Sequence, residues 1–92
     1  MQEPSARAEA PEARLKRLAM RSMRRGIKEM DLILGAFAAD NLARMAEADL
    51  RLYDALLSEN DQDLYQWVTG QTAAPERFCA LIAEISAHTR AR

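Results

Sequence analysis

Apolar residues recur every three or four positions along most of the chain, the spacing that lines one buried face of an α-helix. The clearest stripe comprises Ile27, Met30, Ile33, Leu34 and Phe37. No stretch alternates apolar and polar residues for long enough to indicate a β-strand. The pattern predicts an all-α protein, a compact bundle of about five short helices. The other expected buried stripes are Leu15, Leu18, Ala19 and Ser22; Ala46, Leu50, Tyr53 and Leu57; Leu64, Trp67 and Val68; and Phe78, Leu81, Ile82 and Ile85.

The length of the chain limits how long one helix can be. Helix propensity alone would join the second stripe to the third, expected at about 46–57, in a rod of about 30 residues and roughly 45 Å. Such a rod cannot pack compactly in 92 residues, so we expect a break near Asn41–Met45. We assign residues 1–10 to a flexible N-terminal tail, 11–89 to a single helical-bundle domain and 90–92 to a C-terminal tail.

Prolines, glycines and acidic residues predict where helices begin and end. Pro11 suits the first turn of a helix that runs to about residue 25. Asn60 and Asp61 supply turn and capping chemistry, and Asp61 or Asp63 can cap the short fourth helix at its N-terminus. Gly70 is expected to end that helix as the left-handed residue beyond its C-terminus.

Charge is balanced overall but divided along the chain. Lys and Arg number 13 against 14 Asp and Glu, a net charge of -1. Residues 1–28 hold eight basic and three acidic residues, net +5, which leaves five basic and eleven acidic residues, net -6, for 29–92. The basic first helix either steers an acidic partner or is a solvated face. A basic helix can also bind phosphates, but the acidic remainder and the lack of a recognition motif argue against nucleic acid.

Few residues of the chain carry the chemistry of catalysis or metal binding. The single cysteine, Cys79, and the single histidine, His88, are nine positions apart on the last predicted helix, roughly 13 Å along its axis and beyond hydrogen-bond reach. We interpret Cys79 as a core or boundary residue and His88 as a solvated residue that complements the helix dipole. No apolar run approaches the length of a membrane span. We therefore predict no catalytic residue, no metal site, no membrane insertion and no enzymatic activity.

The stretch from Arg24 to Asp31 holds a glycine between two helical stripes. Gly26 is expected to turn the chain through a positive φ. Glu29 falls in the first turn of the following helix, where the helix dipole favours its negative charge. It lies four positions from Arg25. One interpretation is a well-capped corner with a surface ion pair between Arg25 and Glu29. The other is a rigid polar corner offered to a partner protein, which requires these two side chains to be accessible.

The second helix carries an apolar residue off its main stripe. Leu32 points about 200° from Met30 and lies beside Gly35 and Ala36. Either this helix is central in the bundle and buried on two sides, or the second face is a flat patch that docks another protein. A generic helical adaptor is therefore one alternative for the function.

At this corner the sequence resembles the FAD assembly factor family, the SdhE-type succinate dehydrogenase assembly factors. Its RGxxE motif corresponds to Arg25-Gly26-Ile27-Lys28-Glu29, flanked by Arg24 and Asp31, and the resemblance covers about residues 14–86. A second block at family-like spacing comprises Leu56, Leu57, Asp61, Asp63, Leu64, Trp67 and Gly70.

The resemblance implies a five-helix assembly factor that binds the flavoprotein subunit of succinate dehydrogenase, and in bacteria fumarate reductase too. Such proteins promote covalent attachment of FAD to a histidine of that subunit. The expected partner-binding residues are Arg25, Gly26 and Glu29, with Arg24 and Asp31 as weaker candidates. We expect a monomer that holds no FAD tightly. Because acidic residues interrupt the first 14 positions, we expect a bacterial, cytoplasmic protein rather than a mitochondrial one.

Overall fold

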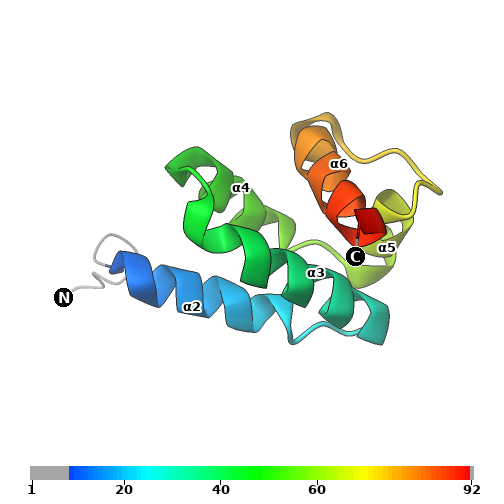
Figure 1. Ribbon diagram of the computed structural model, residues 1–92. Helices are drawn as coiled ribbons and strands as arrows, with labels where there is room; N and C mark the ends of the chain where they lie inside the picture. The colour runs from blue at the N-terminus through cyan, green and yellow to red at the C-terminus, as the bar shows by residue number, and fades with distance from the viewer. Residues whose placement is uncertain (1–8, 92) are drawn as a thin grey trace.

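A computed structural model describes residues 9–91 of the chain. Within them no strand occurs, and the helices are α2 (Pro11–Ser22), α3 (Lys28–Asn41), α4 (Glu47–Leu56), α5 (Asp61–Val68) and α6 (Glu76–Ala91), with a 3-10 turn, η1 (Leu42–Arg44), after α3 (Figure 1). The predicted all-α bundle of five helices is therefore confirmed. No helix in this range combines the length and the apolar character needed to cross a membrane.

The ends of the chain bear on the expected tails. Residues 1–8 and 92 lie outside the described residues. Helix α6 continues to Ala91, two residues beyond the domain end that we expected. The rest of the division into tails and a domain stays a prediction.

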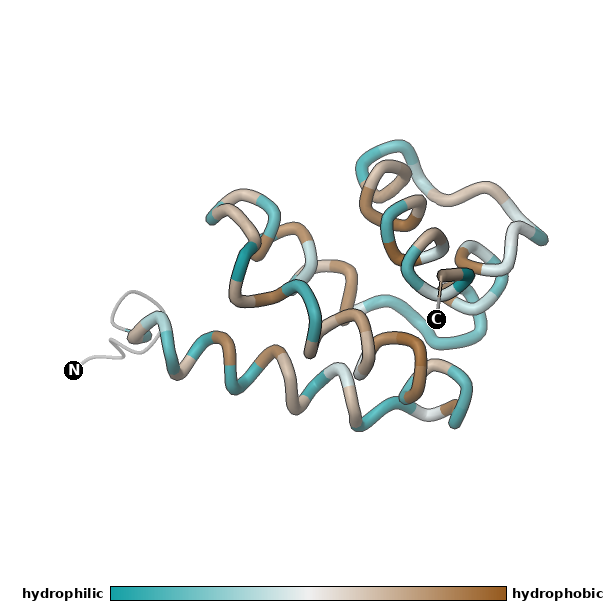
Figure 2. Tube along the Cα trace, viewed as in Figure 1, coloured by the Kyte–Doolittle hydropathy of each residue, from teal (hydrophilic) through white to brown (hydrophobic). Residues whose placement is uncertain are grey.

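Helix α3 lies at the centre of the bundle. It forms an antiparallel pair with α2 and also packs against α5 and α6 (Figure 1). Along α2 the colour changes repeatedly between hydrophilic and hydrophobic, as expected for a helix with one buried face (Figure 2). The buried apolar core comprises Leu18, Met30, Leu34, Phe37, Ala38, Leu42, Leu50, Tyr53, Leu56, Leu57, Leu64, Val68, Phe78, Leu81, Ile82 and Ile85. The predicted stripes supply most of this core, although Ala46 is exposed.

The predicted break between the second and third helices is present. Helix α3 ends at Asn41, whose side-chain amide donates to the carbonyl of Phe37 at 3.0 Å. The turn η1 follows, and Met45 is extended before α4 begins at Glu47. The change of direction lets α3 and α4 both contribute to one core, which a straight rod would prevent.

Three arginines of α2 hold this helix against α4, and we call this set the α2–α4 clamp. Arg14 donates to Glu47 at 2.9 Å, and Arg17 and Arg21 donate to Asp54 at 2.9 and 2.6 Å. The hydrogen bond from Arg14 lowers the pKa of Glu47 to about 2, and that from Arg17 lowers the pKa of Asp54. Much of the positive charge of the first helix is thus neutralised inside the fold.

A buried polar junction lies between the same two helices. Ser22 donates to the carbonyl of Leu18 at 2.8 Å, so its oxygen accepts the hydroxyl hydrogen of Tyr53 at 2.6 Å. Ser22 and Tyr53 are both fully buried, and burial raises the pKa of Tyr53 to about 12. Because each of these hydroxyl groups has a partner, the junction positions α2 on α4 without a desolvated, unpaired group.

The end of α5 follows the sequence prediction. Gly70 has a φ of 82°, the left-handed conformation that favours glycine. The backbone N–H of Gln71 donates to the carbonyl of Gln66 at 2.8 Å, and that of Gly70 to the carbonyl of Trp67 at 3.2 Å. These two bonds satisfy the last carbonyls of the helix and confirm Gly70 as its terminator.

Candidate functional site

The corner of residues 23–27 joins α2 to α3, and the Arg25 side chain is bound within the fold there. Its Nε donates to Asp61 at 2.7 Å, and its two terminal nitrogens donate to the carbonyls of Leu57 at 2.8 Å and Glu59 at 3.1 Å. The side chain is only 9% exposed. The expected ion pair between Arg25 and Glu29 is therefore wrong. An acid that is distant in sequence offers a better-enclosed position than the neighbouring helical turn.

Asp61 is the second half of this junction. One carboxylate oxygen binds Arg25 and the other accepts the backbone N–H of Gly26. The cap of α5 is Asn60, as its expected capping chemistry allows: its side-chain oxygen accepts from the N–H of Gln62 at 2.7 Å. The expectation that Asp61 or Asp63 caps this helix is wrong, because the Asp61 carboxylate is already engaged with the corner.

Helix ends favour the charges of this junction. The Arg25 guanidinium lies against carbonyls at the C-terminal end of α4, where a cation is favoured. Asp61 is the first residue of α5, where the positive end of the helix dipole favours a carboxylate. The junction thus fixes the α2–α3 corner to the α4–α5 connection.

Gly26 is favoured by the limited space for a side chain at this position, and not by a positive φ angle. Within residues 9–91, Gly70 is the residue with a positive φ, so the positive φ expected at Gly26 is wrong. A Cβ atom at Gly26 would lie 3.1 Å from a carboxylate oxygen of Asp61.

Asp31 completes the corner by accepting the backbone N–H of Arg25. Because this N–H is bonded outside a helix, α2 ends at Ser22 and not near residue 25 as expected.

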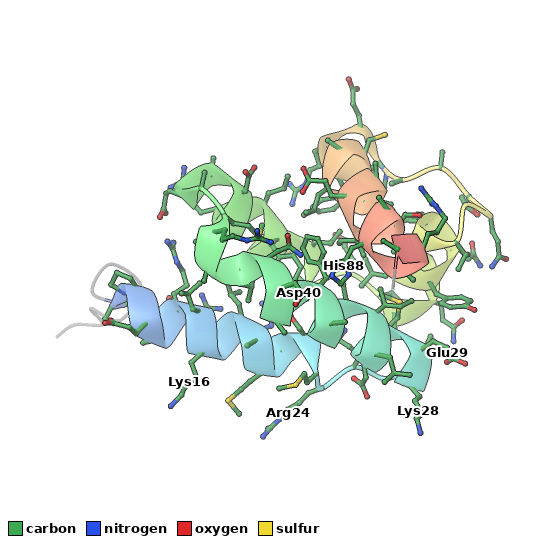
Figure 3. All side chains as sticks on the ribbon, viewed as in Figure 1. Lys16, Arg24, Lys28, Glu29, Asp40 and His88 are labelled. Carbon is green, nitrogen blue, oxygen red and sulfur yellow. The ribbon has the colours of Figure 1, made fainter. Side chains whose placement is uncertain are left out.

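Other residues of the predicted site face solvent. Arg24 and Glu29 are exposed, and Gly26 is exposed beside them. Glu29 lies in the first turn of α3, as predicted, at the same end of that helix as Lys28 (Figure 3). The corner therefore divides the predicted residues into two groups. Arg25 and Asp31 hold it from within, while Arg24, Gly26 and Glu29 form its surface. A docking corner was expected to need both Arg25 and Glu29 accessible; Glu29 meets that condition, and Arg25, 9% exposed, does not.

The two motif blocks meet at this junction. Arg25 of the first block contacts Asp61 and the carbonyl of Leu57 from the second block, across 36 and 32 positions of sequence. Sequence reasoning missed this role of Asp61 because the residue already had a local explanation as a helix cap. The sequence carries no direct signal for this contact, because only the packing of the helices buries Arg25 and makes it need a carboxylate from elsewhere in the chain.

Two further sequence interpretations are wrong. Cys79 is exposed and not a core residue, because it lies outside the buried stripe of α6. His88 is mostly covered, with its Nε2 at 2.7 Å from a carboxylate oxygen of Asp40 and its ring edge-on to Phe37 (Figure 3). Across residues 9–91, no group of His, Cys, Asp and Glu side chains is arranged to hold a metal ion.

Leu32 decides between the two interpretations of the second helix. Its side chain is 65% exposed, whereas Met30 and Leu34 on the opposite face are fully buried. The expectation that this helix is buried on two sides is therefore wrong. On the second face of α3, Leu32 is exposed, while Gly35 and Ala36 beside it are partly covered.

The residues that the structure describes thus form a small helical bundle whose polar corner is held rigidly from within. A family model described as "Flavinator of succinate dehydrogenase" matches residues 16–89. The chain belongs to this family.

Curated relatives carry names in agreement with that assignment. The chain is similar to proteins named "Succinate dehydrogenase assembly factor 2, mitochondrial" from Schizosaccharomyces pombe (38% identical over 86 residues), Dictyostelium discoideum (36% over 73) and Saccharomyces cerevisiae (51% over 53). These matches cover 91%, 79% and 58% of this chain, and 62%, 52% and 33% of the respective relatives. The names describe assembly factors, which agrees with the expectation that the chain is not an enzyme.

The relatives also correct the expected location. We expected a cytoplasmic protein from the acidic residues near the start of the sequence. The relatives are named mitochondrial, which contradicts that expectation. A charge pattern confined to 14 residues is too local a feature to predict the location of the protein. The bacterial origin stays a prediction, since the relatives named above are eukaryotic.

Proposed function

We propose that this protein is an assembly factor that binds the flavoprotein subunit of succinate dehydrogenase and promotes covalent attachment of FAD to it. The observation that carries the proposal is the family match across residues 16–89. Fumarate reductase, whose flavoprotein subunit undergoes the same attachment, is a second client in this proposal. The protein acts as a monomer and holds no FAD tightly itself.

The proposed mechanism is selection of a conformation. A flavoprotein that attaches its own flavin needs its site to be closed correctly around FAD. A helper that binds this closed form more tightly shifts the population toward it, by as much as the difference between its two affinities. A tenfold preference corresponds to about 1.4 kcal/mol, which a few polar contacts can supply.

The corner suits such a role because it is already ordered. The Arg25–Asp61 ion pair and the bonds to Gly26 and Asp31 fix the backbone before any partner arrives. Ordering a flexible loop on binding would reduce the affinity, and a preorganised corner avoids that loss. Glu29 and Arg24 are the accessible charges through which the corner makes its contacts.

The direct test is co-expression of a succinate dehydrogenase flavoprotein subunit with and without this protein. Covalently bound flavin is scored by fluorescence of the denatured subunit in a gel. We expect strong fluorescence only when this protein is present. Equal fluorescence in both samples, at equal subunit amounts, would show that the protein does not promote attachment.

A matched pair of variants tests the corner itself. Glu29→Gln removes an exposed acid from the first turn of α3, and Glu76→Gln removes one from the first turn of α6. We expect Glu29→Gln to weaken binding to the subunit by about tenfold and to reduce flavin attachment. Glu76→Gln should behave as the wild type. If the two variants behave alike, Glu29 is not a contact residue.

A further inference from the structure

Three basic side chains near the α2–α3 corner are not used by the fold. Within residues 9–91, the side chains of Lys16, Arg24 and Lys28 make no ion pair and no hydrogen bond, whereas the arginines of the α2–α4 clamp are all bound to acids. The three point in the same direction, away from α4 and α6 (Figure 3). They place positive charge that no ion pair neutralises on one face of a protein whose net charge is -1.

Large apolar side chains are exposed on α2, on the corner and on α3, close to these cations. Met20 is 41%, Met23 57% and Leu32 65% exposed, and among the described residues these three are the large hydrophobics with open surfaces. Each lies within four positions of Lys16, Arg24 or Lys28. Three exposed apolar side chains gathered beside unpaired cations make this part of the surface a candidate for binding another molecule.

These side chains form one continuous surface. A shallow groove on α2 is lined by Lys16, Met20 and Arg24 together. Met23 continues it onto α3, because a Cβ atom at Gly35 would lie 3.2 Å from the Met23 side chain. Leu32 lies three positions before Gly35 and four after Lys28, on the same side of α3. We call this surface the basic–apolar face: Lys16, Met20, Met23, Arg24, Lys28 and Leu32.

We infer that the basic–apolar face binds a complementary surface of the flavoprotein subunit, an apolar centre bordered by Asp and Glu side chains. This inference rests on the proposed function and extends its contacts from the corner along α2 and the outer side of α3. Charge complementarity identifies the partner surface: the unpaired cations lie beside the apolar residues, so the partner requires acids beside an apolar contact. Methionine side chains adapt to the surface that they cover.

An anionic membrane is the competing occupant, and the structure favours a protein. Three cations provide only a weak attraction to anionic lipid. The apolar side chains lie on two different segments, α2 and α3, and not along one amphipathic helix that could sink into a bilayer. A folded partner surface can contact both segments at once.

Two sets of variants separate the charge contribution from the apolar one. Lys16→Glu with Lys28→Glu should lower the association rate with the purified flavoprotein subunit at least tenfold at low salt and reduce its salt dependence. Met20→Ser with Leu32→Ser should raise the dissociation rate about tenfold with little change in association. The control is a charge reversal away from this face, Arg77→Glu in the first turn of α6, whose guanidinium lies 4.5 Å from the ring centroid of Phe78; this variant should bind the subunit as the wild type does. Unchanged circular dichroism confirms that the variants fold.

The outcomes distinguish this inference from the function on which it rests. If the wild type does not bind the subunit, the proposed function fails and the inference with it. If the wild type binds and both sets of variants bind equally well, the proposed function stands and the inference is wrong. Binding of the wild type to phosphatidylserine–phosphatidylcholine vesicles, lost in the Lys16 and Lys28 variant while subunit binding persists, would assign the face to a membrane and overturn the inference.

Discussion

The Arg25 guanidinium and the Asp61 carboxylate, 36 positions apart in sequence, form an ion pair with side chains 9% and 13% exposed. Arg25 also binds the end of α4, and Asp61 binds the backbone of Gly26. The pair therefore explains why two separate sequence blocks occur together. One supplies the corner, and the other supplies the support that holds the corner in place.

Removal of one partner of this pair should destabilise the protein strongly. Asp61→Ala leaves a poorly solvated guanidinium, so we expect a loss of about 3 kcal/mol in the free energy of unfolding. Arg25→Met should cost a similar amount, since it also leaves the carbonyls of Leu57 and Glu59 without their donor. Chemical denaturation of both single variants and the double variant measures the coupling. A coupling near zero would contradict the structural role of the pair.

Alanine substitutions at two glycines should have effects of opposite sign. Gly26→Ala places a methyl group 3.1 Å from the Asp61 carboxylate, which is fixed by Arg25, and should cost about 1–2 kcal/mol. Gly35→Ala meets only the movable Met23 side chain and gains helix propensity, so it should be neutral or stabilising by up to about 1 kcal/mol. Thermal unfolding compares the two. Equal destabilisation would show that Met23 is held more firmly than its exposure implies.

A larger side chain at Gly26 should reduce function through the shape of the corner. Gly26→Val displaces Asp61 and with it the backbone between Arg24 and Glu29. We expect weaker binding to the flavoprotein subunit and less covalent flavin, with most of the helical circular dichroism retained. Normal flavin attachment by a folded Gly26→Val protein would show that the geometry of the corner is not needed.

Acid should weaken the attachment of α2 to α4. Arg14 lowers the pKa of Glu47 from 4.5 to about 2 in the folded state, so the unfolded chain binds more protons at intermediate pH. This contribution to stability is present above about pH 4.5 and is lost as the pH falls toward 2. Glu47→Gln should therefore flatten the decline of the thermal midpoint in that window, with a remainder from Asp54. An unchanged decline of the thermal midpoint with pH in the Glu47→Gln variant would show that protonation of Glu47 is not what weakens the fold in acid.

Cys79 should react readily in the folded protein. Its exposure on α6 predicts that a thiol reagent modifies it at a rate close to that of the denatured chain. Modification should leave the helical circular dichroism unchanged, because the residue lies outside the core. Strong protection in the native state would contradict this placement.

Much of the site was not readable from local pattern. The sequence indicated a polar corner at Arg25, Gly26 and Glu29, and the structure places a corner there. It did not indicate which of these side chains are accessible, because Arg25 has an acceptable local partner in Glu29 and a better one in Asp61. Local spacing favours the near acid, whereas burial favours the distant one once the helices are packed.

The amino-acid sequence by itself determined the helices, their buried stripes and the termination of α5 at Gly70. These features depend on interactions within a few residues, namely helical periodicity, the freedom of glycine at positive φ and the limit that chain length sets on a straight helix. Tertiary structure alone decided which charged side chains form ion pairs and which remain exposed. Arg14, Arg17, Arg21 and Arg25 meet acids 33 to 37 positions away, which leaves Lys16, Arg24 and Lys28 on the surface. Which cation is neutralised follows from how α2 lies against α4 and how the α2–α3 corner meets Asp61 of α5, and the packing of the core sets both.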